Sequence, residues 1–269
     1  MDPKHPGAVD EILNFGEFWN EEGIRKNKSE IIKITAKIGK LFKRAYRYFA
    51  AAKAIRDDME IIYEEAFNRG KFQKEVRKFK KEIFGTLMDT EKQGKVRHLF
   101  GSALSPNGSV DHYETIVGKM KRVYYVKGSY IKGMSVFLEE LVDEGIKKGF
   151  YMEIYHEPLD EKNIETLIIP KLNVAITVSN KYADAHYKKI DIDAFMNKDL
   201  LTEKEDFLKE DQVMIEKLMK AGLSNITKAK KAHDELEKFY VLNMNFKGID
   251  ELKEKIMNRI REYEKEVKG

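Results

Sequence analysis

An unbroken alternation of three- and four-residue steps between apolar or small side chains constrains the fold of this chain more than any other feature. It runs from Ser29 to Phe67, through Ile31, Ile34, Ile38, Leu41, Ala45, Tyr48, Ala52, Ile55, Met59, Ile62 and Ala66. This spacing is typical of a helix that packs along a second helix. A helix of some 40 residues rises about 60 Å, which exceeds the width of an ordinary domain. We therefore expect a long helical arm, with the shorter amphipathic helix that ends at Gly85 as its partner in a hairpin.

The same spacing returns near the C-terminus, at an offset of 177 residues. At that offset six residue types of the first arm recur: Ala52, Lys53, Asp57, Glu60, Tyr63 and Asn68 match Ala229, Lys230, Asp234, Glu237, Tyr240 and Asn245. A second short helix, with apolar residues from Ile249 to Tyr263, completes the match. The match favours an internal duplication, and a chance likeness between two helices of similar period is the alternative.

Between about Gly94 and Leu200 the pattern changes to short β-branched and aromatic runs, interrupted by Gly, Pro and Asn. These runs predict strands at Val96–Ala103, Arg122–Lys127, Phe150–Tyr155 and Asn173–Val178, with a helix at Met134–Lys148 between the second and the third. A strand, a helix and a strand at this distance form a βαβ unit, which implies a parallel sheet. We therefore expect an α/β fold with a parallel sheet of at least four strands, flanked by two helical hairpin arms.

The expected domains are a helical arm over residues 1–94, an α/β core over 95–200 and a second helical arm over 201–269. A repeat of 177 residues should hold one core and one arm, and the first arm has no core in front of it. We therefore expect the chain to begin inside its first repeat.

The segment from Gly128 to Ser135 is the strongest candidate for a functional site. Its two glycines and its serine have the spacing of a phosphate-binding P-loop between a strand and a helix. In a working P-loop, backbone amides face the phosphates, a lysine reaches their oxygens and a hydroxyl holds magnesium. Ser135 would be the metal ligand if a magnesium nucleotide binds. The candidate cofactor-binding residues are Gly128, Ser129, Lys132, Gly133, Met134 and Ser135.

Four longer sequence segments, spread over nearly the whole chain, carry a resemblance to a known family. They are His5–Ile12, Leu41–Tyr48, Lys95–Phe100 and Ile169–Ile176. On these segments the chain resembles a family of bacterial two-copy P-loop ATPases, common in Firmicutes, in which a sheet core and a helical arm are each present twice. The resemblance implies that the chain is the second half of that architecture, with a core that would bind ATP or ADP together with magnesium.

Two charges of the family's site are missing from this chain. Met134 stands at the position of the P-loop lysine, and Val178 stands where family members carry an aspartate that holds the water shell of magnesium. Tyr130 and Ile131 are also bulkier than the glycine and threonine of members with an intact loop. These departures predict a decayed nucleotide site.

Composition narrows the classes of function further. The chain has 50 Lys and Arg against 46 Asp and Glu, a net charge of only +4, and both signs alternate along it, which argues against a nucleic-acid partner. Cysteine is absent, which excludes disulfides and zinc thiolates and favours a reducing compartment. No stretch approaches the roughly 18 apolar residues of a membrane span. We expect a cytoplasmic protein without membrane contact.

Two functions follow from these observations. The first is a non-hydrolysing interaction or regulatory module that keeps a P-loop NTPase-like fold. The second is an ATP-binding ATPase half that uses Ser135 together with Lys127 or Lys132 in place of the missing lysine. The short return helix cannot cover the long arm. Either the two arms cover each other, or the expected partner is a second copy of the chain, bound through the arms, or a missing N-terminal P-loop core.

Overall fold

The computed structural model describes residues 5, 7, 8, 12–184 and 188–268. The chain divides into two compact units. Unit 1 combines Met1–Phe42 with Lys228–Gly269, and unit 2 is Lys43–Thr227. Of the segment at 5–12, which is one of the four that carry the family resemblance, residues 6 and 9–11 lie outside the described residues.

Two long helices and two shorter ones form the helical part of the chain. The long helices are α2 (Lys28–Ala66) and α7 (Glu205–Val241), and the shorter ones are α3 (Arg69–Phe84) and α8 (Phe246–Lys268). The helix expected from Ser29 to Phe67 is thus confirmed as α2 within one residue at each end. In unit 2, Phe49 of α2 lies so close to Gly222 of α7 that a Cβ on this glycine would come within 2.3 Å of the ring. In unit 1, Lys37 of α2 pairs with Glu235 of α7 at 3.9 Å.

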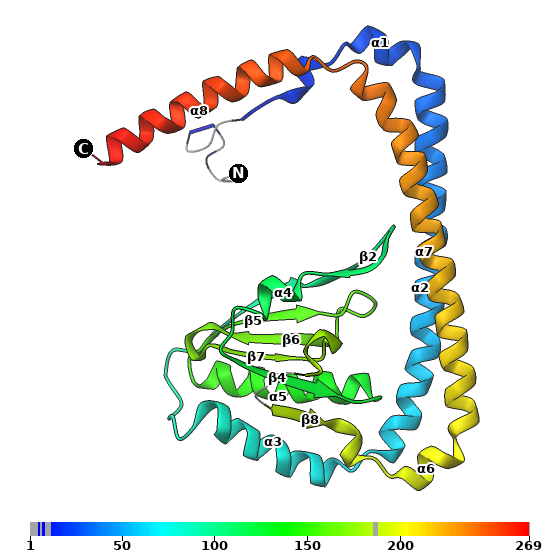
Figure 1. Ribbon diagram of the computed structural model, residues 1–269, viewed down its shortest axis with the longest axis vertical. Coiled ribbons are helices and arrows are strands. Elements are labelled where there is room, and N and C mark those ends of the chain that lie inside the picture. The colour runs from blue at the N-terminus through cyan, green and yellow to red at the C-terminus, as the bar shows by residue number, and fades with distance from the viewer. Residues whose placement is uncertain (1–4, 6, 9–11, 185–187, 269) are drawn as a thin grey trace. The chain divides into compact units, whose positions relative to one another are not determined.

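Helix α3 differs from the expectation in its packing. It was expected to return along the long arm, but its apolar face forms part of the α/β core. The ring centroids of Phe79 and Tyr124 lie 4.8 Å apart, and those of Phe72 and Phe137 lie 6.3 Å apart. Since Phe72 and Phe79 are almost fully buried there, α3 covers one face of the sheet together with α5 (Ile131–Lys147) (Figure 1).

The sheet of unit 2 has six strands in the order β1-β5-β6-β7-β4-β8. Their bounds are β1 Lys95–Phe100, β4 Arg122–Lys127, β5 Tyr151–His156, β6 Ile164–Ile169, β7 Val174–Thr177 and β8 Lys188–Asp191. The pairs β1–β5, β4–β7 and β4–β8 are parallel, whereas β6 is antiparallel to both of its neighbours. The sheet is therefore mixed and mostly parallel, and β4 matches its predicted bounds to the residue.

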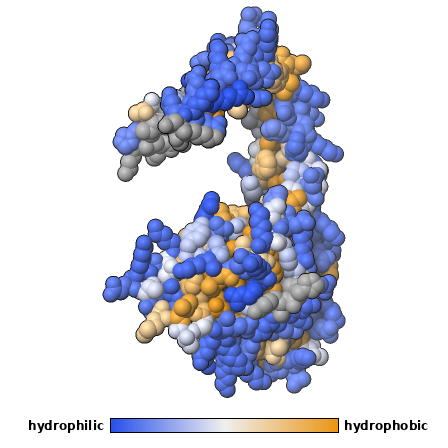
Figure 2. Space-filling model, turned by 60° about the vertical axis from the view of Figure 1, so that its left-hand side comes forward, coloured by the Kyte–Doolittle hydropathy of each residue, from blue (hydrophilic) through white to orange (hydrophobic). Residues whose placement is uncertain are grey.

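Smaller elements complete the two units. Strands β2 (Ser102–Ser105) and β3 (Gly108–Asp111) form an antiparallel ribbon, and α4 (Tyr113–Ile116) packs on the sheet face opposite α5. The short helices are η1 Phe15–Phe18, α1 Glu21–Lys26, η2 Pro170–Leu172, η3 Asn180–Tyr182, η4 Ile192–Phe195 and α6 Lys198–Glu203. Figure 2 shows apolar residues gathered in patches on the α/β body of unit 2, among hydrophilic ones. Among the described residues, no helix combines the length and the apolar character that crossing a membrane requires.

The 177-residue repeat is present in the helical elements themselves. Four pairs of elements begin at this offset: η1 and η4, α1 and α6, α2 and α7, and α3 and α8. The backbone junctions repeat as well. The Asn68 N–H donates to the Phe195 carbonyl at 2.8 Å, and the Asn245 N–H donates to the Phe18 carbonyl at 2.8 Å. Each of these asparagines also caps the helix that follows it, at 3.0 Å.

Candidate functional site

The loop between β4 and α5 is shorter than a phosphate-binding loop. Strand β4 ends at Lys127 and α5 begins at Ile131, so only three residues connect them. The helix start expected at Met134 is wrong by three residues, and Gly133 to Ser135 lie within the helix. The positive φ angles of described glycines fall at Gly7, Gly85, Gly108 and Gly149, and thus at neither glycine of this segment. The backbone does not curl into the expected cradle.

Close packing is the role that the structure gives to both glycines of the segment. A Cβ on Gly128 would lie 2.9 Å from the Cβ of Ile192, and a Cβ on Gly133 would lie 2.4 Å from the ring of Tyr130. Both separations are too short for a real side chain. Both glycines of the segment are therefore closely packed within the protein.

Three carboxylates from distant parts of the chain cover this loop. Asp193 accepts hydrogen bonds from the Ser129 N–H at 2.8 Å and from the Ser129 hydroxyl at 3.1 Å. Glu60 of α2 accepts from the Lys132 N–H, with its two oxygens 3.2 and 3.4 Å away. The Tyr130 hydroxyl donates to Glu64, also of α2. We call Glu60, Glu64 and Asp193 the carboxylate cap.

Burial and hydrogen bonding shift the pKa values of Glu60 and Glu64 in opposite directions. Desolvation raises the pKa of Glu60 from its ordinary value of 4.5 to about 7, and the Lys132 N–H and the Arg56 charge offset only part of this effect. Desolvation also acts on Glu64, but hydrogen bonds from Tyr130 and Arg69 outweigh it and lower the pKa of this carboxyl. The positive end of a helix dipole favours an anion, yet for Glu60 the loss of solvent is the larger effect.

The remaining candidate residues have structural partners. Met134 is buried in the main core. Ser135 is 1% exposed, and its hydroxyl accepts from the Ile164 N–H at 2.9 Å and donates to Glu139 at 2.9 Å. Lys127 pairs with Asp191 at 2.8 Å. The hydroxyl expected to hold magnesium therefore joins α5 to β6.

An acidic groove of about 440 Å³ lies beside the start of α5. Six carboxylates and three basic side chains line it: Asp57, Glu60, Glu64, Glu65, Glu139 and Asp160, with Arg56, Lys132 and Lys162. Arg56 is 7% exposed, and its guanidinium pairs with Glu157, which places one of the basic charges against a further carboxylate. The groove carries an excess of negative charge, the wrong sign for phosphate.

A second cavity, of about 420 Å³, lies at the carboxyl ends of β1, β5 and β7. It contains Glu165, whose carboxylate accepts from the Ser102 hydroxyl at 2.8 Å and from the Tyr113 hydroxyl at 2.5 Å. Burial raises the pKa of Glu165. Sequence reasoning missed this cluster because Tyr113 and Glu165 are 52 residues apart, and no local pattern joins them.

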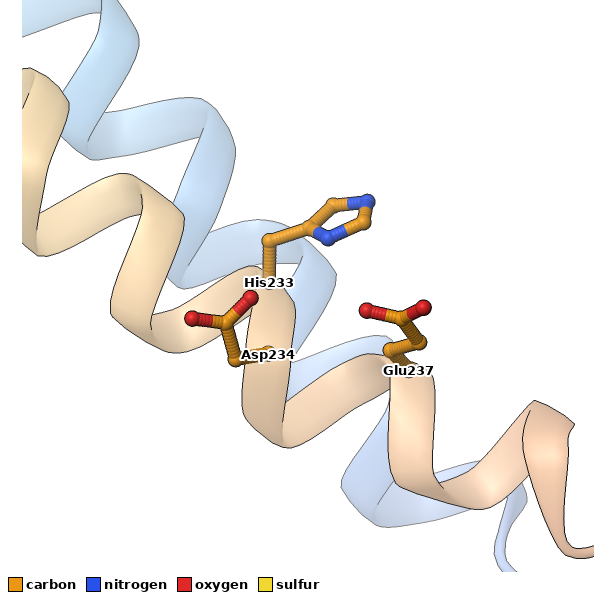
Figure 3. Close-up of side chains that lie close together, drawn as sticks. All are labelled: His233, Asp234 and Glu237. Atoms are coloured by element: carbon orange, nitrogen blue, oxygen red, sulfur yellow. The ribbon is translucent and has the colours of Figure 1, made fainter. Parts of the chain in front are cut away.

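His233, Asp234 and Glu237 form a cluster on the surface of α7 (Figure 3). Their potential ligand atoms lie within 4.8 Å of one another, and all three side chains are exposed. Figure 3 shows His233 and Glu237 projecting from the same side of the helix. Asp234 already pairs with Lys230. His233 thus lies beside two acidic side chains on the surface of α7.

Comparison with known proteins gives no relative from which a function could be transferred. No family model, no curated protein and no solved structure matches the chain. The site must therefore be interpreted from its own geometry and charge.

Proposed function

We propose that this chain is a P-loop NTPase-like protein, related to the two-copy ATPases, that no longer hydrolyses nucleotides and acts as an interaction or regulatory module. The observation that carries the proposal is the Glu60 carboxylate on the Lys132 N–H. In a nucleotide-binding P-loop this end of the helix faces phosphate oxygens. Here a carboxylate of the same chain takes that place.

The residues present do not fit a magnesium-bound phosphate. Met134 is a buried thioether and brings no positive charge. The hydroxyl of Ser135 is engaged with Ile164 and Glu139. Val178 packs against the main core and offers no oxygen ligand from its side chain. The acidic groove adds repulsion, because a nucleotide would bring several negative charges toward six carboxylates.

The rival function, an ATPase half with an unconventional lysine, has one observation in its favour. Lys132 lines the groove beside the start of α5. The Glu60 carboxylate, however, already accepts a hydrogen bond from the backbone N–H of Lys132. Lys127, the other candidate, is held by Asp191. The absence of cysteine supports a reducing compartment such as the cytoplasm for either function.

A measurement of ATP turnover tests the proposal. We expect the purified chain to hydrolyse ATP no faster than a mock preparation. Met134→Lys combined with Val178→Asp should not restore turnover, because the new lysine would start from a buried position and Glu60 would remain in place. Turnover above background that disappears in the Lys132→Ala variant, but persists in a Lys162→Ala control from the same groove, would refute the proposal.

A further inference from the structure

We propose that the cavity beside Glu165 binds a small primary amine, with the ammonium group on the Glu165 carboxylate and a short apolar chain in an adjoining chamber. The proposal stands on the shape of this cavity and on the charges that line it. It does not depend on whether the chain hydrolyses nucleotides.

Two cavities of unit 2 meet at Glu165. The cavity of about 420 Å³ and a smaller one of about 170 Å³ share three lining residues, Glu157, Glu165 and Val178. The smaller one is also lined by Ile131, Met134, Asn163 and Ile164, and we call it the apolar chamber because most of these side chains are apolar. A ligand that extends through both cavities therefore passes the Glu165 carboxylate.

The charged side chains that line the two cavities are all acidic: Asp111, Glu157 and Glu165. Two of them are balanced by basic residues that do not line either cavity. Asp111 pairs with Lys181 at 2.9 Å. Glu157 pairs with the Arg56 guanidinium. Among the described residues no basic side chain pairs with Glu165, so this carboxylate is the one that lacks a counter-charge.

The two oxygens of Glu165 have different surroundings. The hydroxyls of Ser102 and Tyr113 both donate to Oε2. Within the described part of the chain no donor reaches Oε1, and Oε1 does not belong to the buried polar atoms that lack a partner. Oε1 is therefore accessible, while the hydroxyls hold the carboxylate in place. An ammonium group donates hydrogen bonds that such an oxygen can accept.

The electrostatic state of Glu165 also favours a cation. Burial raises the pKa of this carboxyl, and the negative charges of Glu157 and Asp111 raise it further. A positive charge beside Oε1 would offset these effects, whereas a phosphate or carboxylate ligand would add to the repulsion.

An organic cation fits this cavity better than a metal ion does. Hard metal ions require several oxygen ligands around one point. Among the residues that the structure describes, the group of three potential ligands close enough to share an ion is the exposed one of Figure 3, not the carboxylates of this cavity. The apolar chamber then selects a cation with a hydrocarbon chain, and its volume of about 170 Å³ limits this chain to a few methylene groups.

Methyl NMR of the full chain, labelled with ¹³C at the methionine methyl groups, tests the proposal. Met134 lines the apolar chamber, Met219 lines the larger cavity, and Met257 of α8 lines neither and serves as the reference. The probe is n-pentylamine, and n-pentanol is the uncharged control of similar size.

We expect n-pentylamine to shift the Met134 signal saturably and more strongly than the Met219 signal, and n-pentanol to leave both unchanged. Equal shifts with n-pentylamine and n-pentanol overturn the proposal. The absence of a saturable Met134 shift with n-pentylamine up to about 10 mM also overturns it.

Two variants test the role of the Glu165 charge. Glu165→Gln keeps an oxygen that accepts from Ser102 and Tyr113, and it should weaken the binding of n-pentylamine at least about tenfold. Asp111→Asn is the matched control, because this carboxylate lines the same cavity and is already paired, and it should change the Kd by less than about twofold. Equal weakening by both variants, or none by Glu165→Gln, overturns the proposal. The comparison of amine with alcohol needs no variant, so it decides the case if Glu165→Gln fails to fold.

The length of the amine tests the apolar chamber separately. From n-propylamine through n-butylamine to n-pentylamine, each added methylene group should lower the Kd about fourfold, because it is buried in the chamber. A Kd that stays constant along this series would place the hydrocarbon chain outside the chamber and overturn the proposal.

Discussion

Replacing Glu60 by glutamine tests the energetics of the carboxylate cap. Glutamine keeps an oxygen that can accept from the Lys132 N–H, and it removes the negative charge. The pKa of Glu60 is raised to about 7 in the folded chain from an ordinary value of 4.5. Between these two values the folded state binds more protons than the unfolded state, so the charged carboxylate lowers the free energy of unfolding as the pH rises.

The size of the effect follows from the two pKa values. A difference from 4.5 to about 7 corresponds to roughly 3.5 kcal/mol at ~1.4 kcal/mol for each pKa unit. Glu60 borders the open groove and keeps partial contact with solvent, so screening reduces the effect to about 1–2 kcal/mol. Glu60→Gln should therefore stabilise the chain by about 1–2 kcal/mol at pH 8, and the gain should shrink as the pH is lowered to 5.

Urea denaturation of the full chain at pH 5 and at pH 8 measures this difference. Glu65→Gln is the matched control, because this exposed residue lies in the same helix and the same groove, and its effect should stay within about 0.5 kcal/mol at both pH values. A Glu60→Gln variant that is less stable than the parent at pH 8 would refute the reasoning. The charged carboxylate would then be a favourable helix cap whose attraction exceeds its desolvation.

Two further variants test the assignments of single residues. Ser135→Ala should cost about 1–3 kcal/mol in urea denaturation, because the buried Ile164 N–H loses its acceptor, and a cost near zero would contradict the role of this hydroxyl. Phe72→Ala should cost about 3–5 kcal/mol, whereas Ile249→Ala at the repeated position should cost about 1 kcal/mol because its side chain is only partly covered. Equal losses of stability at the two positions would contradict the difference in burial between α3 and α8.

Much of the fold could be predicted from the sequence because its strongest patterns are local. Strand β4 has a run of β-branched and aromatic residues between Arg122 and Lys127 and is followed by a glycine, and α2 has an uninterrupted helical period. Strands β6 and β8 were not predicted. Glu165 interrupts the apolar run of β6, and β8 has only four residues, two of which are lysines. The antiparallel direction of β6 depends on pairing across the sheet, which a βαβ pattern does not contain.

The segment from Gly128 to Ser135 joins β4 to a helix, as the sequence predicted, but its conformation was not predicted. The spacing of Gly128 and Gly133 predicted a cradle, whereas in the structure the helix starts at Ile131 and the glycines serve close packing. The carboxylate cap could not be found from local patterns, because Glu60 lies 72 residues before Lys132. Its contact with the loop depends on where α2 packs, and this is a property of the folded chain.

Titration calorimetry with ATP and with ADP, each with and without magnesium, tests the central claim most directly. At pH 8 most of the Glu60 carboxyl is ionised, so the groove carries its full negative charge. We expect no saturable heat in any of the four titrations at nucleotide concentrations up to about 1 mM, which corresponds to binding weaker than about −4 kcal/mol. A saturable heat at one nucleotide per chain would contradict it.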